Sequence, residues 1–400
     1  MSAINKKTKE PQIAFEDRKS LKPDIVLKVI NGISQIICLT IPNVYNYNGL
    51  SVWYILYSLV LISLLFLLLY WTIKLKFDGY YNFVDKTCVI DLLVMSCYTI
   101  SNSVAMFYTV IFQRKNLVTA IRFIEELSNL YEMPVILKSF NDTKVFLVLV
   151  VLLHSCFGGI LTASIVLCCL KIEYFNIIFS IIYLVNLYVV VITTLQIQNF
   201  AVILRNRYKI LNENLLTTVQ DTKNAQNLRD NQRSIVQYLK IYDKLCDIQD
   251  CFNGILGLPI YCLSWLIPAQ SLQTINFVLE YKLKLDGISI SINYVEVLWS
   301  SSLTITGLIC AFVIAFFTNQ VKKESHATAS ISYQYLLDIP SRSSNVYVIG
   351  IRDYLLHLTH QVRYRNACFN ASGGFIVDIS FMSRMLVMIL SHIVMLLQFD

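Results

Sequence analysis

Polar side chains recur on one face of the last apolar stretch, which ends SHIVMLLQFD at residues 391–400. Ser391, His392 and Gln398 interrupt a run that is otherwise mostly aliphatic. At about 100° per residue, a helix gathers them on one face with their neighbours three and four residues away. We call this face the polar stripe: Met388, Ser391, His392, Met395, Gln398 and Phe399. Within lipid, such a stripe requires protein partners or water.

Two interpretations of the polar stripe are open at this point. The hydroxyl, imidazole and amide groups could hydrogen-bond neighbouring helices. Alternatively, they line a pore in which a ring of Gln398 amides offers dipoles to a cation with weak selectivity, and a ring of Phe399 side chains closes the path by excluding water. His392 would add a group that titrates near about pH 6.5 when unperturbed.

Catalytic chemistry has little support elsewhere in the chain. There is no Walker loop, no GxGxxG after a strand and no HExxH. The adjacent side chains of Glu324, Ser325 and His326 rarely converge into a relay on one backbone. Most of the 11 cysteines lie within or beside apolar runs, and none has zinc-site spacing. We therefore expect no enzyme activity, cofactor or metal site.

The composition indicates a membrane protein. Hydrophobic residues make up 56% of the 400 residues and charged residues only 15%, against about 25% in soluble domains. A helix needs about 20 apolar residues to cross the hydrocarbon core. Six stretches qualify: 52–73, 92–113, 145–170, 174–199, 252–279 and 297–321. A seventh stretch, 385–399, is shorter but can extend back through Phe381. Residues 25–42 contain Lys28 and end in proline, which favours an amphipathic or re-entrant helix.

The distribution of basic residues predicts the orientation. The N-terminal arm and the connections after the second, fourth and sixth segments contain 26 of the 33 lysines and arginines, and the connections on the other side contain 6. Cytoplasmic loops of membrane proteins carry the excess of Lys and Arg. The sequence therefore predicts an all-α polytopic fold with seven transmembrane helices, a cytoplasmic N-terminus and an extracellular C-terminus.

These features divide the chain into six segments. The arm before the first helix contains the possible amphipathic or re-entrant helix, and the two long cytoplasmic connections separate groups of transmembrane helices. The segments are the cytoplasmic arm (1–51), transmembrane helices one to four (52–199), a cytoplasmic helical extension (200–251), transmembrane helices five and six (252–321), a second cytoplasmic region (322–380) and transmembrane helix seven (381–399). The family resemblance described below implies that residues 322–380 are an anchor region and that helix seven lines a pore.

Two apolar stripes in the 200–251 connection predict helices that continue beyond the membrane. Both follow helical spacing: Leu204, Tyr208, Leu211 and Leu215, and then Ile235, Leu239, Tyr242 and Cys246. They indicate either a local helical hairpin that buries its own stripes or a surface that packs against other subunits.

The end of the chain carries a family resemblance. Ser391-His392, five apolar residues and Gln398-Phe399 keep the spacing of a signature that reads Thr-Tyr, five mostly hydrophobic residues and Gln-Phe. Serine keeps the hydroxyl of threonine, whereas His392 departs from tyrosine. Upstream, the run from Gly374 to Asp378 supplies a glycine, an aromatic residue and an acid at matching positions. Together with seven predicted helices and a cytoplasmic N-terminus, this ending resembles the insect gustatory receptor family and, more distantly, insect odorant receptors.

The resemblance implies a tastant-gated, non-selective cation channel of four identical or related subunits, in which the last helix lines the pore. It places the chain in the plasma membrane of a sensory neuron dendrite, with a small-molecule tastant as partner. The sugar-sensing branch has glutamate directly after the tyrosine, and here Ile393 stands there. This difference favours the divergent branches that are linked to bitter plant compounds, and the family pattern favours the pore interpretation of the polar stripe.

Ligand contacts are expected in the outer halves of the helices or near the membrane midplane. A small-molecule site is mostly apolar with a few placed polar groups. Each candidate is alternatively a helix-packing residue or an interface anchor. The candidates are Tyr98, Thr162, Tyr183, Asn186, Trp265, Gln270, Gln273, Glu296, Trp299 and Ser300.

Two other membrane classes remain as alternatives. A G-protein-coupled chemoreceptor would have the opposite orientation, and neither Asp-Arg-Tyr after the third segment nor Asn-Pro-x-x-Tyr in the seventh is present. A secondary transporter would show internal repeats and broken helices. The sequence contains no convincing repeat, although Gly254, Gly257 and Pro259 are expected to interrupt the fifth helix.

Overall fold

The computed structural model describes residues 52–79, 86–112, several positions between 116 and 127, and residues 174–223, 227–285, 294–339, 345–365 and 367–399. These residues form helices and no strand; an isolated bridge joins Asn370 and Ile376. The named helices are α2 (Val52–Gly79), α3 (Lys86–Ile111), α6 (Tyr174–Lys223), α7 (Leu228–Leu285), α8 (Tyr294–Asp338), α9 (Val346–Tyr364) and α10 (Ile379–Phe399). The expected all-α class is confirmed for this part of the chain.

Several helices are long and apolar enough to cross a membrane. Five such stretches lie in α2, α3, α6, α7 and α8, and α10 contains a shorter apolar stretch over Ile379–Met395. The expected third transmembrane helix (145–170) and the N-terminal arm with residues 25–42 lie outside the described residues. The described residues therefore have the helices expected of a multi-pass membrane protein.

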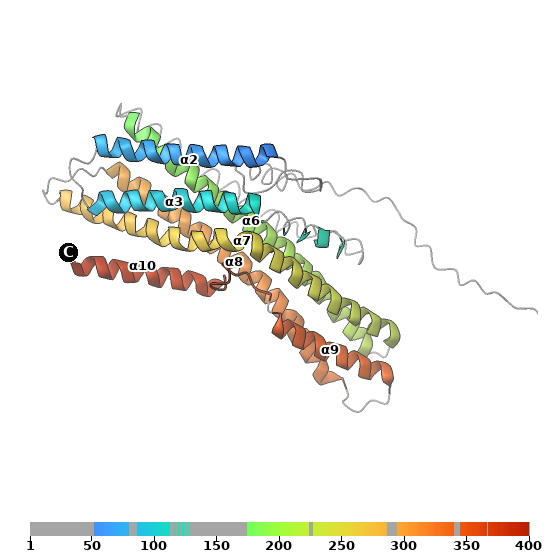
Figure 1. The fold of residues 1–400 in the computed structure, drawn as a ribbon. Helices are drawn as coiled ribbons and strands as arrows, with labels where there is room; N and C mark the ends of the chain where they lie inside the picture. The colour runs from blue at the N-terminus through green and yellow to red at the C-terminus, as the bar shows by residue number, and fades with distance from the viewer. Residues whose placement is uncertain are drawn as a thin grey trace, which may run out of the picture.

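Three helices continue far beyond the thickness of a bilayer. α6, α7 and α8 contain 50, 58 and 45 residues, so each is roughly 65–90 Å long against a hydrocarbon core of about 30 Å. Figure 1 shows that one end of this long bundle lies beside α2, α3 and α10, and that α9 packs on the other end. We call these ends the membrane half and the distal half; the distal half comprises α9 with residues 204–223, 228–250 and 321–338.

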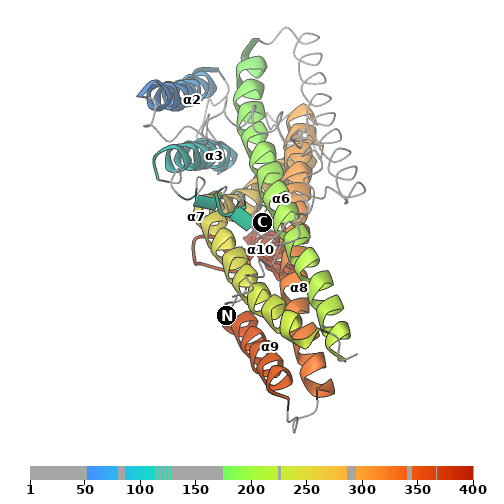
Figure 2. The ribbon, with the colours of Figure 1, turned by 90° about the vertical axis from the view of Figure 1, so that its right-hand side faces the viewer.

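The distal half is a helical hairpin closed by α8 and α9 (Figure 2). Seven of the eight residues of the two apolar stripes are buried inside the chain, and Leu239 is half-buried against the same core. Tyr208 and Tyr242 face each other across the hairpin with ring centroids 5.7 Å apart. The α9 helix adds Ile351, Leu355, Leu358 and Val362. The stripes therefore form a core within one chain, which is the local-hairpin interpretation.

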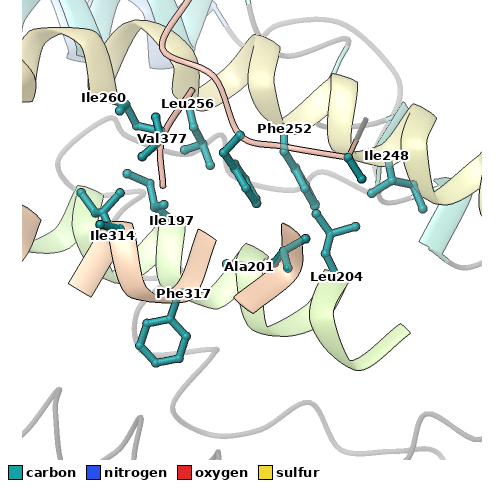
Figure 3. Packing of buried hydrophobic residues seen from close by; sticks show 14 of the residues in the cluster. Ile197, Ala201, Leu204, Ile248, Phe252, Leu256, Ile260, Ile314, Phe317 and Val377 are labelled. Carbon is teal, nitrogen blue, oxygen red and sulfur yellow. The ribbon is translucent and has the colours of Figure 1, made fainter. Parts of the chain in front are cut away.

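The two halves share one apolar core at their junction. Figure 3 shows Phe252 of α7 directed toward Ala201 and Leu204 of α6. Phe252 is fully buried, and its ring centroid lies 4.3 Å from that of Phe200. Val377, in the loop before α10, is buried in the same cluster. The start of α10 is therefore attached to the core that holds the long helices together.

The expected interruption of the fifth helix is wrong. α7 runs from Leu228 to Leu285 through Pro259 and Pro268 without a break. A proline removes one backbone hydrogen bond, and neighbouring helices can support the helix around it. Both prolines are buried against the rest of the chain. Continuity of α7 keeps the membrane half and the distal half in one rigid element.

Candidate functional site

The first turn of α10 is fixed by a capped ion pair. Asp378 precedes the helix and accepts hydrogen bonds from the backbone N–H and the hydroxyl of Ser380, at 3.0 and 2.7 Å. An acceptor at this position satisfies a free N–H of the helix start. Lys322 of α8 donates to the other carboxylate oxygen at 2.8 Å. The start of α10 is thus tied to the middle of α8.

The loop before α10 lies against the backbone of α7. Asn253 donates from Nδ2 to the carbonyl of Cys368 at 3.1 Å, and its Oδ1 accepts from the backbone N–H of Asn370 at 3.1 Å. Gly257 lies so close that a Cβ built on it would be 2.8 Å from the backbone nitrogen of Ser372. The loop turns at Gly373, whose φ of +78° favours glycine. The family-like run from Gly374 to Asp378 therefore begins at this turn.

Over its first turns, α10 packs on α7 and α8 through one edge. Phe381 and Met385 are buried, and the Phe381 ring stacks on Phe375 with centroids 5.4 Å apart. The opposite side carries large apolar residues that are more than half exposed, Val387, Leu390 and Val394. Because a membrane helix needs a surrounding of lipid or protein, this side is available to lipid or to another chain.

The structure places the polar stripe beside this packed edge. Ser391 is exposed and His392 is half-buried, and both are within hydrogen-bond distance of the Met388 carbonyl, at 2.8 and 2.6 Å. Met395 is 55% exposed, and Gln398 is also exposed. Phe399 is the last residue of α10, and its side chain lies outside the described part. Ser391, Met395 and Gln398 thus remain open within one chain.

A second set of polar groups is buried in the membrane half. Asn186 of α6 accepts from Nδ2 of Asn102 on α3 at 2.7 Å and donates to Thr99 at 3.3 Å. On α7, Gln273 donates from Nε2 to the carboxylate of Asp91 on α3. Asp91 is 1% exposed. These bonds join α3 to both α6 and α7.

The same set continues between α7 and α8. Nε2 of Gln270 donates to the Ser300 hydroxyl at 3.2 Å. The Thr274 hydroxyl lies 2.7 Å from the hydroxyls of both Ser300 and Thr304. We call the whole set the polar layer: Asp91, Thr99, Asn102, Asn186, Gln270, Gln273, Thr274, Ser300 and Thr304. It connects four helices through hydrogen bonds rather than through apolar contact alone.

One acceptor of the polar layer has no donor in the described part of the chain. Gln270 is only 1% exposed, yet among the described residues none donates a hydrogen bond to its Oε1. Buried acceptors in folded proteins are nearly always satisfied by protein, water or a ligand. The Oε1 atom is therefore a suitable contact for a donor that enters from outside the chain.

The other expected ligand contacts are scattered. Tyr98 is buried in the main core, whereas Trp265 is 55% exposed and meets the edge of Tyr261. Tyr183 and Trp299 lie on α6 and α8, with side chains outside the described part, and Thr162 lies in an undescribed segment. The structure thus brings together Gln270 and Ser300, and places Asn186 and Gln273 in the same polar layer. It does not bring Trp265 to them.

Sequence reasoning missed Asp91, Thr99, Asn102, Thr274 and Thr304. The predicted second apolar segment begins at Leu92, directly after Asp91, and therefore does not include this carboxylate. An ionisable residue at the edge of an apolar run is a signal worth keeping, because such residues within membranes face the bundle interior.

No group of three or more His, Cys, Asp or Glu side chains that could hold a metal occurs among the described residues.

Comparison with known proteins identifies the family. The model of the 7tm chemosensory receptor family matches residues 27–400. No curated protein matches the chain. Among solved structures, the fold is similar to the insect olfactory receptor OR5 from Machilis hrabei in complex with eugenol, with a TM-score of 0.61, 13% identity, and coverage of 94% of this chain and 98% of that one. At this identity the likeness concerns the fold. The chain belongs to the 7tm chemosensory receptor family.

Proposed function

We propose that the protein is a gustatory receptor that acts as a tastant-gated, non-selective cation channel. The observation that carries the proposal is the polar stripe of α10, whose Ser391, Met395 and Gln398 are exposed and which keeps the Ser391…Gln398-Phe399 spacing of the gustatory signature. The membership in a chemosensory family and the fold shared with an olfactory receptor support the same class. The receptor would act in the plasma membrane of a sensory dendrite, where the current starts signal transduction.

The pore would form where the polar stripes of four subunits meet. A polar face on an otherwise apolar helix is unfavourable toward lipid. Four copies around an axis would turn Ser391, Met395 and Gln398 toward a common water-filled path. The amide of Gln398 would offer weakly selective dipoles to cations, and Phe399 at the helix end would close the path in the resting state.

The tastant would bind at the polar layer. Ligand sites are mostly apolar with a few placed polar groups, and the polar layer supplies such groups between apolar helix faces. A ligand hydroxyl or amine donor would satisfy Oε1 of Gln270. Many bitter plant compounds combine such a donor with an apolar body. This agrees with the ligand class expected from Ile393, which stands where the sugar-sensing branch has glutamate.

α8 would couple ligand binding to the pore. Its Ser300 and Thr304 belong to the polar layer, and its Lys322 holds Asp378 at the start of α10. A displacement of α8 at the ligand would therefore act on the first turn of the pore helix. The shared core around Phe252 and Val377 would transmit the same displacement.

Subunit contacts would use the distal half. Its internal stripes are buried, but α8 and α9 still expose large apolar and aromatic residues: Tyr333, Leu337, Val346, Tyr347, Ile349, Leu356 and Tyr364. Exposed apolar residues in such number on one part of a protein are typical of an association surface. The four subunits would be copies of this chain or related receptors.

Expression of this chain alone in cells without other taste receptors tests the proposal. A panel of bitter plant compounds should evoke a current without added G-protein components. The reversal potential of this current should be that of a channel in which Na⁺ and K⁺ permeate equally. A response that requires G protein, or uptake of the compound without current, would contradict the proposal. The family and fold matches do not favour a G-protein-coupled receptor or a transporter.

A further inference from the structure

Arg384 is the only Asp, Glu, Lys or Arg on α10. It lies near the Ile379 end of the helix, is exposed, and donates from Nε to the Ser380 carbonyl at 3.4 Å. No carboxylate forms an ion pair with it among the described residues. A lone charge in an apolar helix is unfavourable unless it reaches water or lipid headgroups. The side of α10 on which Arg384 lies therefore indicates which of these surroundings it reaches.

The helical angle of Arg384 coincides with that of the polar stripe. Seven residues turn a helix through about 700°, so Ser391 lies within about 20° of Arg384, and Met395 also lies within about 20°. Gln398 lies within about 40° by the same count. Arg384 therefore extends the polar stripe one turn toward the start of α10.

The lipid-facing alternative has a different angular position. Val387, Val394 and Leu390, which are exposed and apolar, lie about 60–120° around the helix from Arg384, all on the same side. An arginine anchored in lipid headgroups would be expected on that apolar sector. The neighbouring Asp378 does not neutralise Arg384, because its carboxylate is held by Lys322 and it lies about 120° away around the helix.

We propose that Arg384 sets the direction in which the channel conducts best. The inference rests on the proposed function, in which four polar stripes meet around one path. Four guanidinium groups would then form a positive ring at the Ile379 end of the pore, which is the cytoplasmic end in the expected orientation. The ring lowers the concentration of cations that enter from the cytoplasm, so outward current is smaller than inward current.

The expected size follows from screened electrostatics. Four charges at about 8 Å from an ion, in water at physiological salt, lower the local cation concentration about threefold. The ratio of outward to inward current at equal and opposite voltages should therefore rise about threefold when the ring is removed. The charge acts on an entering ion and not on ligand binding, so the tastant concentration for half-maximal response should stay unchanged.

Current–voltage curves of tastant-activated channels in symmetrical salt test the inference. R384Q should raise the outward-to-inward ratio about threefold, and low salt should enlarge the difference. The matched control is the double variant S383R/R384Q, which keeps the charge at nearly the same depth but moves it about 100° around the helix. It should behave like R384Q. An unchanged ratio in R384Q, or a wild-type ratio in the double variant, would overturn the inference.

A second measurement is independent of current. The cysteine variants R384C and S383C are exposed to a charged, membrane-impermeant thiol reagent in open membrane fragments, and the added label is counted by mass spectrometry above the 11 native cysteines. R384C should be modified while S383C stays largely unmodified. Equal labelling of both would overturn the inference, whereas selective labelling in a protein that gives no tastant current would contradict only the proposed function.

Discussion

α8 and α10 are both apolar helices, but they are enclosed in different ways. α8 contacts α6, α7, α9 and α10, and its Ser300 and Thr304 are hydrogen-bonded to α7 in the membrane half. α10 contacts α7 and α8 through one edge and leaves Ser391 and Gln398 open. A helix that is satisfied within its own chain serves the fold. A helix that presents polar groups outward requires water or other subunits, which is the condition for a pore.

The largest expected difference between the two helices is in stability. Ile314 of α8 is 2% exposed, so Ile314→Ala should lower the free energy of unfolding by about 2–5 kcal/mol. Leu390 of α10 is 59% exposed, and Leu390→Ala should cost less than about 1 kcal/mol. Thermal unfolding of the detergent-solubilised protein, followed by size-exclusion chromatography, measures both. Equal losses would show that α10 is as enclosed as α8.

The position of α10 also depends on the close approach of its preceding loop to α7. Gly257→Ala places a methyl group against the backbone of Ser372 and should destabilise the protein by about 1–3 kcal/mol. The matched control is Gly307→Ala on α8, where the methyl group would make ordinary contact with Ile267. Alanine is favoured over glycine in helices by about 1 kcal/mol, so this variant should be neutral or stabilising. The same thermal assay separates them, and a neutral Gly257→Ala would contradict the contact.

Buried polar groups between α7 and α8 should affect sensitivity more than stability. Gln270→Leu removes the free acceptor and should raise the tastant concentration for half-maximal current about tenfold, which corresponds to one hydrogen bond of about 1.4 kcal/mol. Maximal current should be retained because the pore is unchanged. The control Ser391→Ala should leave the sensitivity as it is. A Gln270→Leu receptor with wild-type sensitivity would place the ligand elsewhere.

The Lys322–Asp378 pair gives the smallest expected effect. Burial alone would raise the pKa of Asp378, but the Lys322 ammonium and the Ser380 groups outweigh it and hold the pKa below its ordinary 3.8. The pair therefore stabilises the start of α10 fully above pH 3.8, and the contribution is lost as the pH falls through the lowered pKa. Lys322→Gln should lower stability by roughly 1 kcal/mol equally at pH 7 and pH 5. A difference that disappears at pH 5 would contradict the pKa direction.

Much of the fold is readable from the sequence. Charge-free apolar runs predicted stretches of α2, α3, α6, α7, α8 and α10, and the periodic stripes around Leu211 and Tyr242 indicated that two of these helices continue beyond the membrane. The ends of the helices were less accurate. The predicted fourth span ends at Asn199, whereas α6 continues past the charged Arg205 to Lys223. The hydropathy pattern shows which part of a helix lies in the membrane. It does not show where the helix ends, because a helix can continue outside the membrane.

The site was less readable because it depends on tertiary contacts. The polar stripe follows from residue spacing along one helix. The polar layer joins Asn186 to α3 and Gln273 to Asp91 across more than 80 residues, and no local pattern encodes such pairs. Trp265 is a predicted ligand contact by residue type, and its side chain is exposed rather than part of the polar layer. Proximity between distant segments is what the sequence alone could not supply.

The central claim is that the polar stripe of α10 lines the ion path. Single-channel recording of Gln398→Ala and Phe399→Ala, with Leu390→Ala as an off-stripe control, tests it most directly. Gln398→Ala should change the unitary conductance or the Na⁺/K⁺ preference, and Phe399→Ala should give a resting cation leak without ligand. Leu390→Ala should conduct like the wild type. Wild-type conductance and no leak in both stripe variants, at normal surface expression, would contradict the pore assignment.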